Sequence, residues 1–359
     1  MKTYIKTFKS LVFASLFIVV ASCSIDDIKP LNQLTQENTI RDKVSAQQVL
    51  NGVYDLGREF DVNSFPLYLA AYGNEGMITG SLSGGTGYNT NEVPVDNPFL
   101  ASLYNGHYKI INSCNFLIKG LEAGDAVDIS DVRRDEMISE AKFQRAFAYF
   151  NLLRYFGQFY DLSSTYGVVL RTEFSTELTA DPRNSVQEVY NFIQSDLQYA
   201  AANGPQFIQH FYSGRLAAQA LLAKVELYMG NYGVAATLAN QVINNTEGYA
   251  LEAQYSSIFA NRFNSSEVIF APFSTSGSEA GSSMDLINRT SYSETLRSTA
   301  DAQVGLAADG DLTGAGANYD PRFSYAYSDA TQGVNMQGKY PFIGSSSSEG
   351  NTLYHLRLA

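Results

Sequence analysis

The sequence predicts a mainly α-helical protein in which helical hairpins form a scaffold, with long irregular loop insertions and little β-structure. Apolar residues recur at helical spacing in four segments, 45–56, 99–121, 134–156 and 186–197. Residues 213–246 carry two further helical stripes joined by a Gly-Asn turn. Residues 60–98 and 250–350 are instead rich in Gly, Asn and Ser and carry few helical stripes. The scaffold is therefore expected to be helical and the insertions irregular.

The first two predicted helices are 45–56 and 99–121. Ser45-Ala46-Gln47-Gln48 matches a capping box, which places the start of the first helix at Ser45. The second helix contains Cys114 within an apolar stretch, which indicates a small core residue. A catalytic thiol would need a neighbouring base, and no residue close to Cys114 in the sequence offers one.

The third predicted helix, 134–156, is apolar around most of its circumference. Phe143, Phe147 and Phe150 occupy one side, and small or apolar residues occupy another. A helix with this pattern is buried on most faces and belongs at the centre of a fold. Glu140 and Arg145 would then be buried too, so both are predicted to be structural anchors with polar partners.

A second capping box and the clearest structural unit follow a long insertion. Ser185 and Glu188 match a capping box that starts the next helix. Residues 213–246 are 34 residues of helix–turn–helix with alanines at the helix crossing, which is the geometry of a tetratricopeptide repeat. One repeat cannot bury its own apolar face, so the other helices are expected to stack against it. An unrelated helical bundle is the alternative.

Residues 1–22 match a secretory signal peptide. Three lysines precede an unbroken apolar run from Leu11 to Val20, and small residues then lead to Cys23. The run is too short to span a bilayer, which needs about 20 apolar residues. A cysteine at this place predicts a bacterial lipoprotein that is lipid-modified at Cys23; the alternative is a soluble secreted protein in which Cys23 is incidental. With lipid on Cys23, Cys114 has no disulfide partner within the chain.

The chain is acidic, with a net charge of −12 over 359 residues. Removal of the three lysines of the signal peptide leaves 21 basic and 36 acidic residues, a net charge of −15. Nucleic-acid binding needs clustered lysine and arginine, so no nucleic-acid partner is expected. With 45% hydrophobic and 17% charged residues, the composition is that of an ordinary globular protein.

Several segments together carry a resemblance to a known family. They are the lipoprotein start, EAKFQRAFAYFNLLRYFGQF from Glu140, the 34-residue unit, YSSIFANRFNSSEVIFAPF from Tyr255, DPRF from Asp320 and LYHLRLA from Leu353. In order and spacing they resemble the SusD/RagB family of nutrient-binding outer-membrane lipoproteins of Bacteroidetes. The resemblance covers nearly the whole chain, and it implies that 23–359 is one SusD/RagB-like domain with tetratricopeptide-like helices.

The resemblance also bears on the end of the chain. In that family, the segment similar to 353–359 opens a further helix, and a helical region follows it. This chain stops at Ala359 within an apolar stripe and without a helix stop signal. A C-terminally truncated domain is therefore expected, with exposed apolar patches near 353–359.

The resemblance implies a binding protein rather than an enzyme. Such proteins capture glycans, or in some branches oligopeptides, and pass them to a SusC-like TonB-dependent outer-membrane transporter. The protein would be anchored to the outer membrane by lipid at Cys23 and exposed on the cell surface, and no cofactor or metal is expected. The chain has 24 Tyr, 22 Phe and no Trp. Starch-binding members often use Trp as the sugar platform, so a peptide ligand stays open.

Tyrosines and polar residues on two loops are the candidate ligand-binding residues. Aromatic faces stack on sugar rings, while amides, carboxylates and guanidinium groups bind hydroxyls. The first loop contributes Tyr72, Asn74, Glu75, Tyr88 and Asn89, and the second contributes Arg289, Tyr292, Tyr319, Tyr325 and Tyr327. For each tyrosine, the alternative is a half-buried ring with its hydroxyl in water.

Other kinds of chemistry have weaker support in the sequence. His107, His210 and His355 are far apart and lack metal-ligand spacing, which indicates structural or surface roles. The segment Asp309–Asp320 resembles a calcium loop, but its twelfth position is Asp and no helices flank it, which favours a solvated acidic turn. Two alternatives to capture are a glycoside hydrolase, with paired carboxyl groups in a deep cleft, and a periplasmic repeat scaffold without a small ligand.

Overall fold

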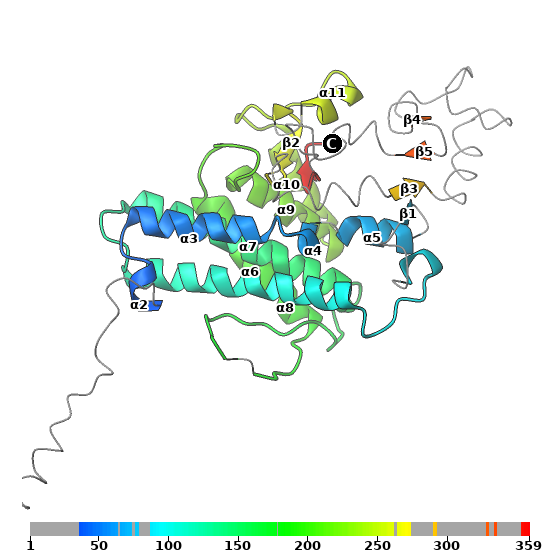
Figure 1. The fold of residues 1–359 in the computed structure, drawn as a ribbon. Coiled ribbons are helices and arrows are strands. Elements are labelled where there is room, and N and C mark those ends of the chain that lie inside the picture. Colours follow the sequence, from blue (N-terminus) through cyan, green and yellow to red (C-terminus); the bar gives the residue numbers. More distant parts are fainter. Residues whose placement is uncertain are drawn as a thin grey trace, which may run out of the picture. The chain divides into compact units, whose positions relative to one another are not determined.

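The computed structural model describes residues 36–63, 65–73, 76–78, 87–177, 179–261, 264–273, 290–292, 328–329, 334–335 and 353–359. The chain divides into two units, the first ending at Thr39 and the second beginning at Ile40. Of the first unit, α2 (Gln36–Thr39) is described, so the predicted signal peptide 1–22 and Cys23 lie outside the described residues. The following account concerns the second unit (Figure 1).

Helices dominate the second unit, and its described strands are short. The helices are α3 (Lys43–Leu56), α4 (Phe60–Asn63), α5 (Phe65–Tyr72), the 3-10 helix η3 (Tyr88–Thr90), α6 (Pro98–Ala123), α7 (Asp131–Phe156), α8 (Val186–Asn203), α9 (Arg215–Tyr228), α10 (Tyr232–Ile243) and α11 (Tyr255–Ala260). The strands are β1 (Gly76–Ile78), β2 (Val268–Phe270), β3 (Thr290–Tyr292), β4 (Ser328–Asp329), β5 (Val334–Asn335) and β6 (Leu356–Arg357). The predicted mainly α fold with little β-structure is confirmed.

Helix α7 is the central helix of the scaffold. It packs against α3, α6 and α8, while α9 packs against α8 and α10 against α9 (Figure 1). Phe143 and Phe147 of α7 contact the ring of Phe270 in β2, whereas Phe150 contacts Tyr228 of α9. The predicted central position of this helix is confirmed, and its three phenylalanines pack against two neighbouring elements, β2 and α9.

Capping side chains determine where the helices begin. At α8, Ser185 accepts the backbone N–H of Glu188 at 3.2 Å and the Glu188 carboxylate accepts that of Ser185 at 2.7 Å, which confirms the predicted capping box. Helix α3 begins before the predicted residue, because Asp42 rather than Ser45 is its N-cap. The Asp42 carboxylate accepts the N–H of Ser45 at 2.7 Å, and the Ser45 hydroxyl accepts that of Asp42 at 3.0 Å. The predicted start was wrong because a serine can occupy either end of a capping box.

Helices α9 and α10 form the predicted hairpin within residues 213–246. The turn holds Gly230 at φ 80°, a left-handed conformation that glycine adopts without steric cost. The side-chain amide of Asn231 donates to the Glu226 carboxylate at 2.7 Å, and Gln194 of α8 donates to the same carboxylate at 2.6 Å. The turn is thereby tied to the preceding helix, and α8, α9 and α10 stack as repeat geometry predicts.

A buried polar network joins α6, α7 and α8. The guanidinium of Arg145 donates two hydrogen bonds of 2.8 Å to the Asp196 carboxylate and one of 2.6 Å to the Asn115 side chain. Arg145 is 5% exposed and Asp196 is 2% exposed. Arg145 is therefore the structural anchor that the sequence predicts. The adjacent Cys114 is a buried core residue, also as predicted, and burial raises the pKa of its thiol.

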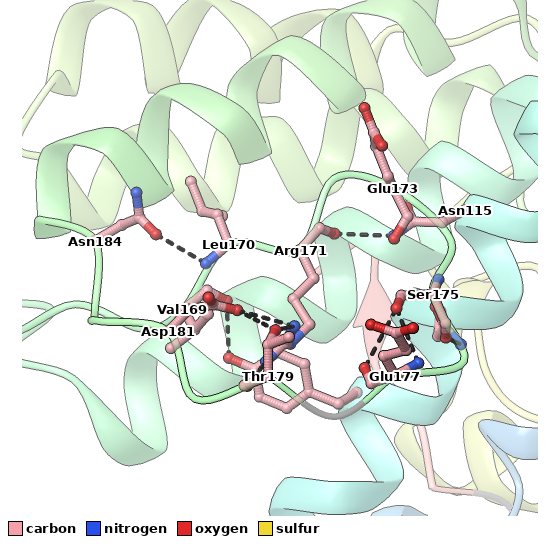
Figure 2. Close-up of polar contacts among 12 residues, drawn as sticks. Asn115, Val169, Leu170, Arg171, Glu173, Ser175, Glu177, Thr179, Asp181 and Asn184 are labelled. Carbon is pink, nitrogen blue, oxygen red and sulfur yellow. Dashed lines mark hydrogen bonds and ion pairs between the residues drawn. The ribbon is translucent and has the colours of Figure 1, made fainter.

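The same network fixes the long segment between α7 and α8 (Figure 2). The Asn115 amide donates to the backbone carbonyls of Arg171 at 2.9 Å and Glu173 at 3.1 Å. The Arg171 side chain in turn forms a 3.0 Å ion pair with Asp181 and donates to the Thr179 hydroxyl at 3.0 Å. The Tyr149 hydroxyl of α7 also donates to the Arg171 carbonyl, at 2.9 Å. The backbone of the segment is thus held to α6 and α7 by hydrogen bonds.

Glu140, the other predicted anchor, joins α7 to α3. Its carboxylate accepts a 2.7 Å hydrogen bond from the Tyr54 hydroxyl and forms a 3.1 Å ion pair with Arg133. The Tyr54 hydroxyl also lies 2.9 Å from the hydroxyl of Ser213, just before α9. Burial raises the pKa of Glu140 to about 7, although Arg133 and the Tyr54 hydroxyl act in the opposite direction. The predicted role as a partnered anchor is confirmed.

The C-terminal segment differs from the prediction. Strand β6 pairs antiparallel with β2, with Phe270 opposite Leu356. The side chains of Leu353 and Leu356 are only 8% and 6% exposed, so the expectation of an exposed apolar patch near 353–359 was wrong. Leu353 packs in a cluster that includes Phe65 and Tyr68, and Leu356 packs in the main core. Pairing with a strand distant in the sequence also places a strand where the resemblance implied the start of a helix. Exposed apolar side chains lie instead on the α9–α10 hairpin, at Leu227, Tyr232, Val234 and Ile243.

Candidate ligand-binding site

Strand pairing brings the two predicted ligand-binding loops together. Strand β1 of the first loop pairs antiparallel with β3 of the second, with Gly76 opposite Tyr292 and Ile78 opposite Thr290. The pairing continues to β5 and β4, which gives a four-stranded sheet in the order β1-β3-β5-β4. Segments more than two hundred positions apart in the numbering therefore form one structure.

Tyr72 is the described candidate whose ring is most accessible. It is the last residue of α5 and is 46% exposed. Tyr68 of the same helix anchors it to α6, because the centroid of its ring lies 5.0 Å from that of Phe99. The Tyr72 carbonyl accepts a hydrogen bond from the Asn91 amide. An exposed ring on a fixed backbone suits stacking against an apolar ligand face.

Tyr88 and Asn89 support the first loop from inside. The Tyr88 ring is 2% exposed and packs 4.8 Å from that of Tyr68. Its burial raises the pKa of Tyr88 to about 12. The Asn89 side chain accepts the N–H of Ile78 at 2.9 Å and donates to the carbonyl of Ile78 at 2.7 Å, as a neighbouring strand would. Both residues thus hold β1 and α5 in place, and their direct contact with a ligand stays a prediction.

Replacement of Asn89 by alanine is expected to loosen β1. The Ile78 N–H and carbonyl would lose both side-chain partners, at a cost of about 1–2 kcal/mol to local stability. Hydrogen exchange should then be roughly tenfold faster at the Ile78 amide. The exposed Glu92, replaced by glutamine, is the control in the same loop. If the Ile78 amide were equally protected from hydrogen exchange in both variants, a supporting role for Asn89 would be refuted.

The remaining candidate residues lie outside the described part of the chain. These are Asn74, Glu75, Arg289, Tyr319, Tyr325 and Tyr327, together with the side chain of Tyr292 and the acidic segment Asp309–Asp320. Their assignment to a binding site, and the interpretation of the acidic segment as a solvated turn rather than a calcium loop, stay predictions.

A large cavity reaches the surface beside Tyr72. Its volume is about 960 Å³, at the upper end of the roughly 300–1,000 Å³ typical of small-molecule sites. Leu69 and Gly73, which flank Tyr72 in the sequence, are exposed and line this cavity. Its aromatic lining comes from five parts of the chain and consists of Tyr54, Phe147, Tyr155, Phe211, Tyr212, Phe270, Phe273 and Tyr354. Sugar rings bind against such aromatic walls.

Basic groups converge on the same cavity. Its lining includes Arg154 of α7, Lys224 of α9, His107 of α6 and His355 before β6. Burial lowers the pKa of His355 to about 3, and the charges of Lys224, Arg154 and His107 act in the same direction. Burial, followed by the charge of Arg154, also lowers the pKa of Lys224. Burial also lowers the pKa of His107, to about 4, so both histidines are neutral at pH 7. The positive charge of the described lining lies on Arg154, Lys224 and Arg58, of which Arg58 is paired with Asp55.

The sequence gives little local sign of this cavity. Its patterns predict a buried core helix at 134–156 and ligand contacts on loops, and the spacing of His107 and His355 does not connect them. One local signal was present: Gln144, Asn151 and Arg154 are polar residues in the mainly apolar stretch 143–156. All three line the cavity. The other contributing elements lie far apart in the sequence, so their meeting leaves no local pattern.

Neither a metal site nor a membrane-spanning helix is found within the described residues. No group of three or more His, Cys, Asp or Glu side chains there is placed to hold a metal ion. None of the helices described is both long enough and apolar enough to cross a membrane.

Comparison with known proteins identifies the family. Residues 27–227 match the SusD-like family described as "Starch-binding associating with outer membrane". A SusD-like protein of Bacteroides ovatus is 26% identical over 182 residues, which are 47% of this chain and 31% of the relative. SusD-like protein P2 of Formosa agariphila is 27% identical over 255 residues, which are 69% of this chain and 48% of the relative. The matched regions thus span less than half the length of either relative.

Solved structures show the same fold. A SusD superfamily protein from Bacteroides thetaiotaomicron superposes with a TM-score of 0.74 at 24% identity, covering 88% of this chain and 73% of that protein. A laminarin-binding SusD-like protein superposes with a TM-score of 0.67 at 20% identity, covering 89% of this chain and 78% of that protein. The family match covers more than half of the chain, and this chain therefore belongs to the SusD-like family, as the resemblance in its sequence predicted.

Proposed function

We propose that the protein captures glycans on its loop-bearing face and passes them to a SusC-like TonB-dependent outer-membrane transporter. The observation that carries this proposal is the β1–β3 pairing, which joins the two candidate loops a few residues after the exposed Tyr72 and the cavity-lining Gly73. The description of the family as starch-binding and the laminarin-binding structural relative support a carbohydrate ligand.

Capture would rest on stacking and hydrogen bonding, without a covalent step. Tyr72 offers an aromatic face to the C–H side of a sugar ring, and polar groups of the loops and cavity orient its hydroxyls. Asp55 is the one carboxyl residue in the described cavity lining, and it forms a 3.1 Å ion pair with Arg58. Glycoside hydrolysis uses two carboxyl groups flanking the bond, so this cavity favours capture over cleavage.

Membrane attachment is the second part of the proposal. The lysines, apolar run and small residues of 1–22, followed by Cys23, support cleavage of a signal peptide and lipid modification of that cysteine. A single domain from residue 23 to 359 would then stand at the cell surface, lipid-anchored to the outer membrane. The family description, which places its members at the outer membrane, supports this location.

Replacement of Tyr72 by alanine is expected to weaken glycan binding about tenfold, because one stacked ring contributes roughly 1–1.5 kcal/mol. The measurement is calorimetric titration of the unlipidated protein with neutral oligosaccharides and with peptides. Tyr160, an exposed tyrosine in the segment after α7, gives the control variant Tyr160→Ala.

Chromatography of the ligand after titration completes this test. Saturable binding of intact oligosaccharide, weakened by the Tyr72 variant alone, is the expected result. A cleaved product would make the protein an enzyme, and saturable binding of peptides alone would remove the glycan assignment.

A further inference from the structure

The cavity carries positive charge without a matching carboxylate. Arg154 and Lys224 line it, and the single acidic residue in its described lining, Asp55, is paired with Arg58. The whole chain has a net charge of −12, so a basic cavity is a local departure from the overall balance. A basic cavity in an acidic protein attracts anions, whereas the acidic surface around it repels them.

Arg154 is held among aromatic rings, and Lys224 is half-buried. The Arg154 guanidinium lies 4.4 Å from the ring centroid of Phe150, 5.4 Å from that of Tyr155 and 5.8 Å from that of Tyr228. Its neighbour Lys224 is half-buried, and its pKa is lowered first by burial and then by Arg154. Two like charges in a partly dry site repel each other, and an anion between them would relieve that repulsion.

Two buried donors on residues that line the cavity lack partners within the described protein. The side chain of Gln144, 4% exposed, lines the cavity, and within the described protein its Nε2 has no hydrogen-bond partner. The Nε of Arg154 is likewise buried without a partner there. Buried donors are nearly always satisfied. A side-chain rotation that opens either nitrogen to the cavity would let an acceptor on a ligand satisfy it.

We propose that this cavity is a subsite for an acidic sugar residue, a uronate or a sulfated sugar, whose anionic group lies between Arg154 and Lys224. The aromatic lining, Phe147 and Phe270 included, supplies the walls for the ring, and Gln144 donates to an oxygen of the sugar. The inference rests on the proposed glycan capture and adds the class of sugar. The same anionic chemistry could also come from a polypeptide carboxylate, and the test separates the two sources.

The variant Lys224→Met tests the contribution of the positive charge of Lys224 to ligand binding. Methionine is close to lysine in length, and removal of one of two repelling cations should leave the melting temperature unchanged or raise it. Lys119→Met is the matched control, because Lys119 is exposed on α6 and does not line the cavity. The ligand pair is trigalacturonate and its methyl ester, which differ in charge but keep the same sugar skeleton.

The expected result is trigalacturonate binding at least tenfold tighter than its ester, with a preference that falls at high salt. Lys224→Met should remove most of this preference, and Lys119→Met should keep it. Neutral glycan or ester binding with no preference for the acid would overturn this inference and leave glycan capture standing. A triaspartate peptide that binds in a Lys224-dependent way, while trigalacturonate does not, would overturn the sugar assignment. Absence of binding to every saccharide would overturn both proposals.

Discussion

Replacement of Asp196 by alanine is expected to lower the free energy of unfolding by about 3–5 kcal/mol. The reason is that the substitution would leave the charge of Arg145 without a counter-ion. Arg145 is 5% exposed and donates two hydrogen bonds of 2.8 Å to the Asp196 carboxylate. A buried guanidinium without its counter-charge must be desolvated without compensation. Urea denaturation followed by circular dichroism measures the change.

Two further variants make this prediction specific. Asp181→Ala breaks the Arg171–Asp181 ion pair of the exposed segment (Figure 2) and should cost less than about 1 kcal/mol. The double variant Arg145→Met with Asp196→Leu removes both charges at once and should be more stable than Asp196→Ala alone. If Asp196→Ala cost no more than Asp181→Ala, the network would not be the anchor that joins α6, α7 and α8.

The stability of the wild-type protein relative to a Glu140→Gln variant is expected to fall as the pH rises from about 4.5 to about 7. Burial raises the pKa of Glu140 from 4.5 to about 7, so the folded state holds this proton more tightly than the unfolded state does. Below pH 4.5 both states are protonated, and no ionisation penalty exists. Above pH 7 the carboxylate is ionised in both states, and the folded protein carries the full penalty, about 3 kcal/mol.

Urea unfolding at a series of pH values between 4 and 8 tests this sign. Glutamine keeps the acceptor for the Tyr54 hydroxyl but cannot ionise, so the variant should lack this part of the pH dependence. Glu136→Gln is the control, because Glu136 is bound to the same Arg133 at 2.9 Å but is more exposed. A wild-type profile parallel to that of Glu140→Gln would contradict the raised pKa.

The helical scaffold was predictable because its signals are local. The stripe of 134–156, the Ser185–Glu188 capping box and the 213–246 hairpin each lie within a few turns of chain, and each appears in the structure. Charged residues on a helix that is apolar all round must find partners, which is why Glu140 and Arg145 could be predicted as anchors from the sequence.

The predictions that were wrong or missing share a physical cause, which is that they depend on contacts between residues distant in the sequence. Apolar side chains near 353–359 were expected to be exposed, but Leu353 and Leu356 pack in core clusters with residues distant in the sequence. Strands of two or three residues carry too few side chains for a periodic pattern, so neither β2–β6 nor β1–β3 could be predicted from sequence. The start of α3 was misplaced because the choice between Asp42 and Ser45 depends on backbone geometry at the cap.

Sequence alone thus established the helical class, the hairpin, the anchors and the family, because periodicity, capping and motif order are written in neighbouring residues. The cavity required the folded chain: His107, Arg154, Lys224 and His355 come from four separate elements. Their individual residue types have ordinary structural roles in most proteins. They form a candidate binding site only because helix packing and strand pairing place their charges and hydrogen-bond donors around one cavity. Electrostatic and hydrogen-bonding interactions depend on the distance between groups, not on their order in the chain.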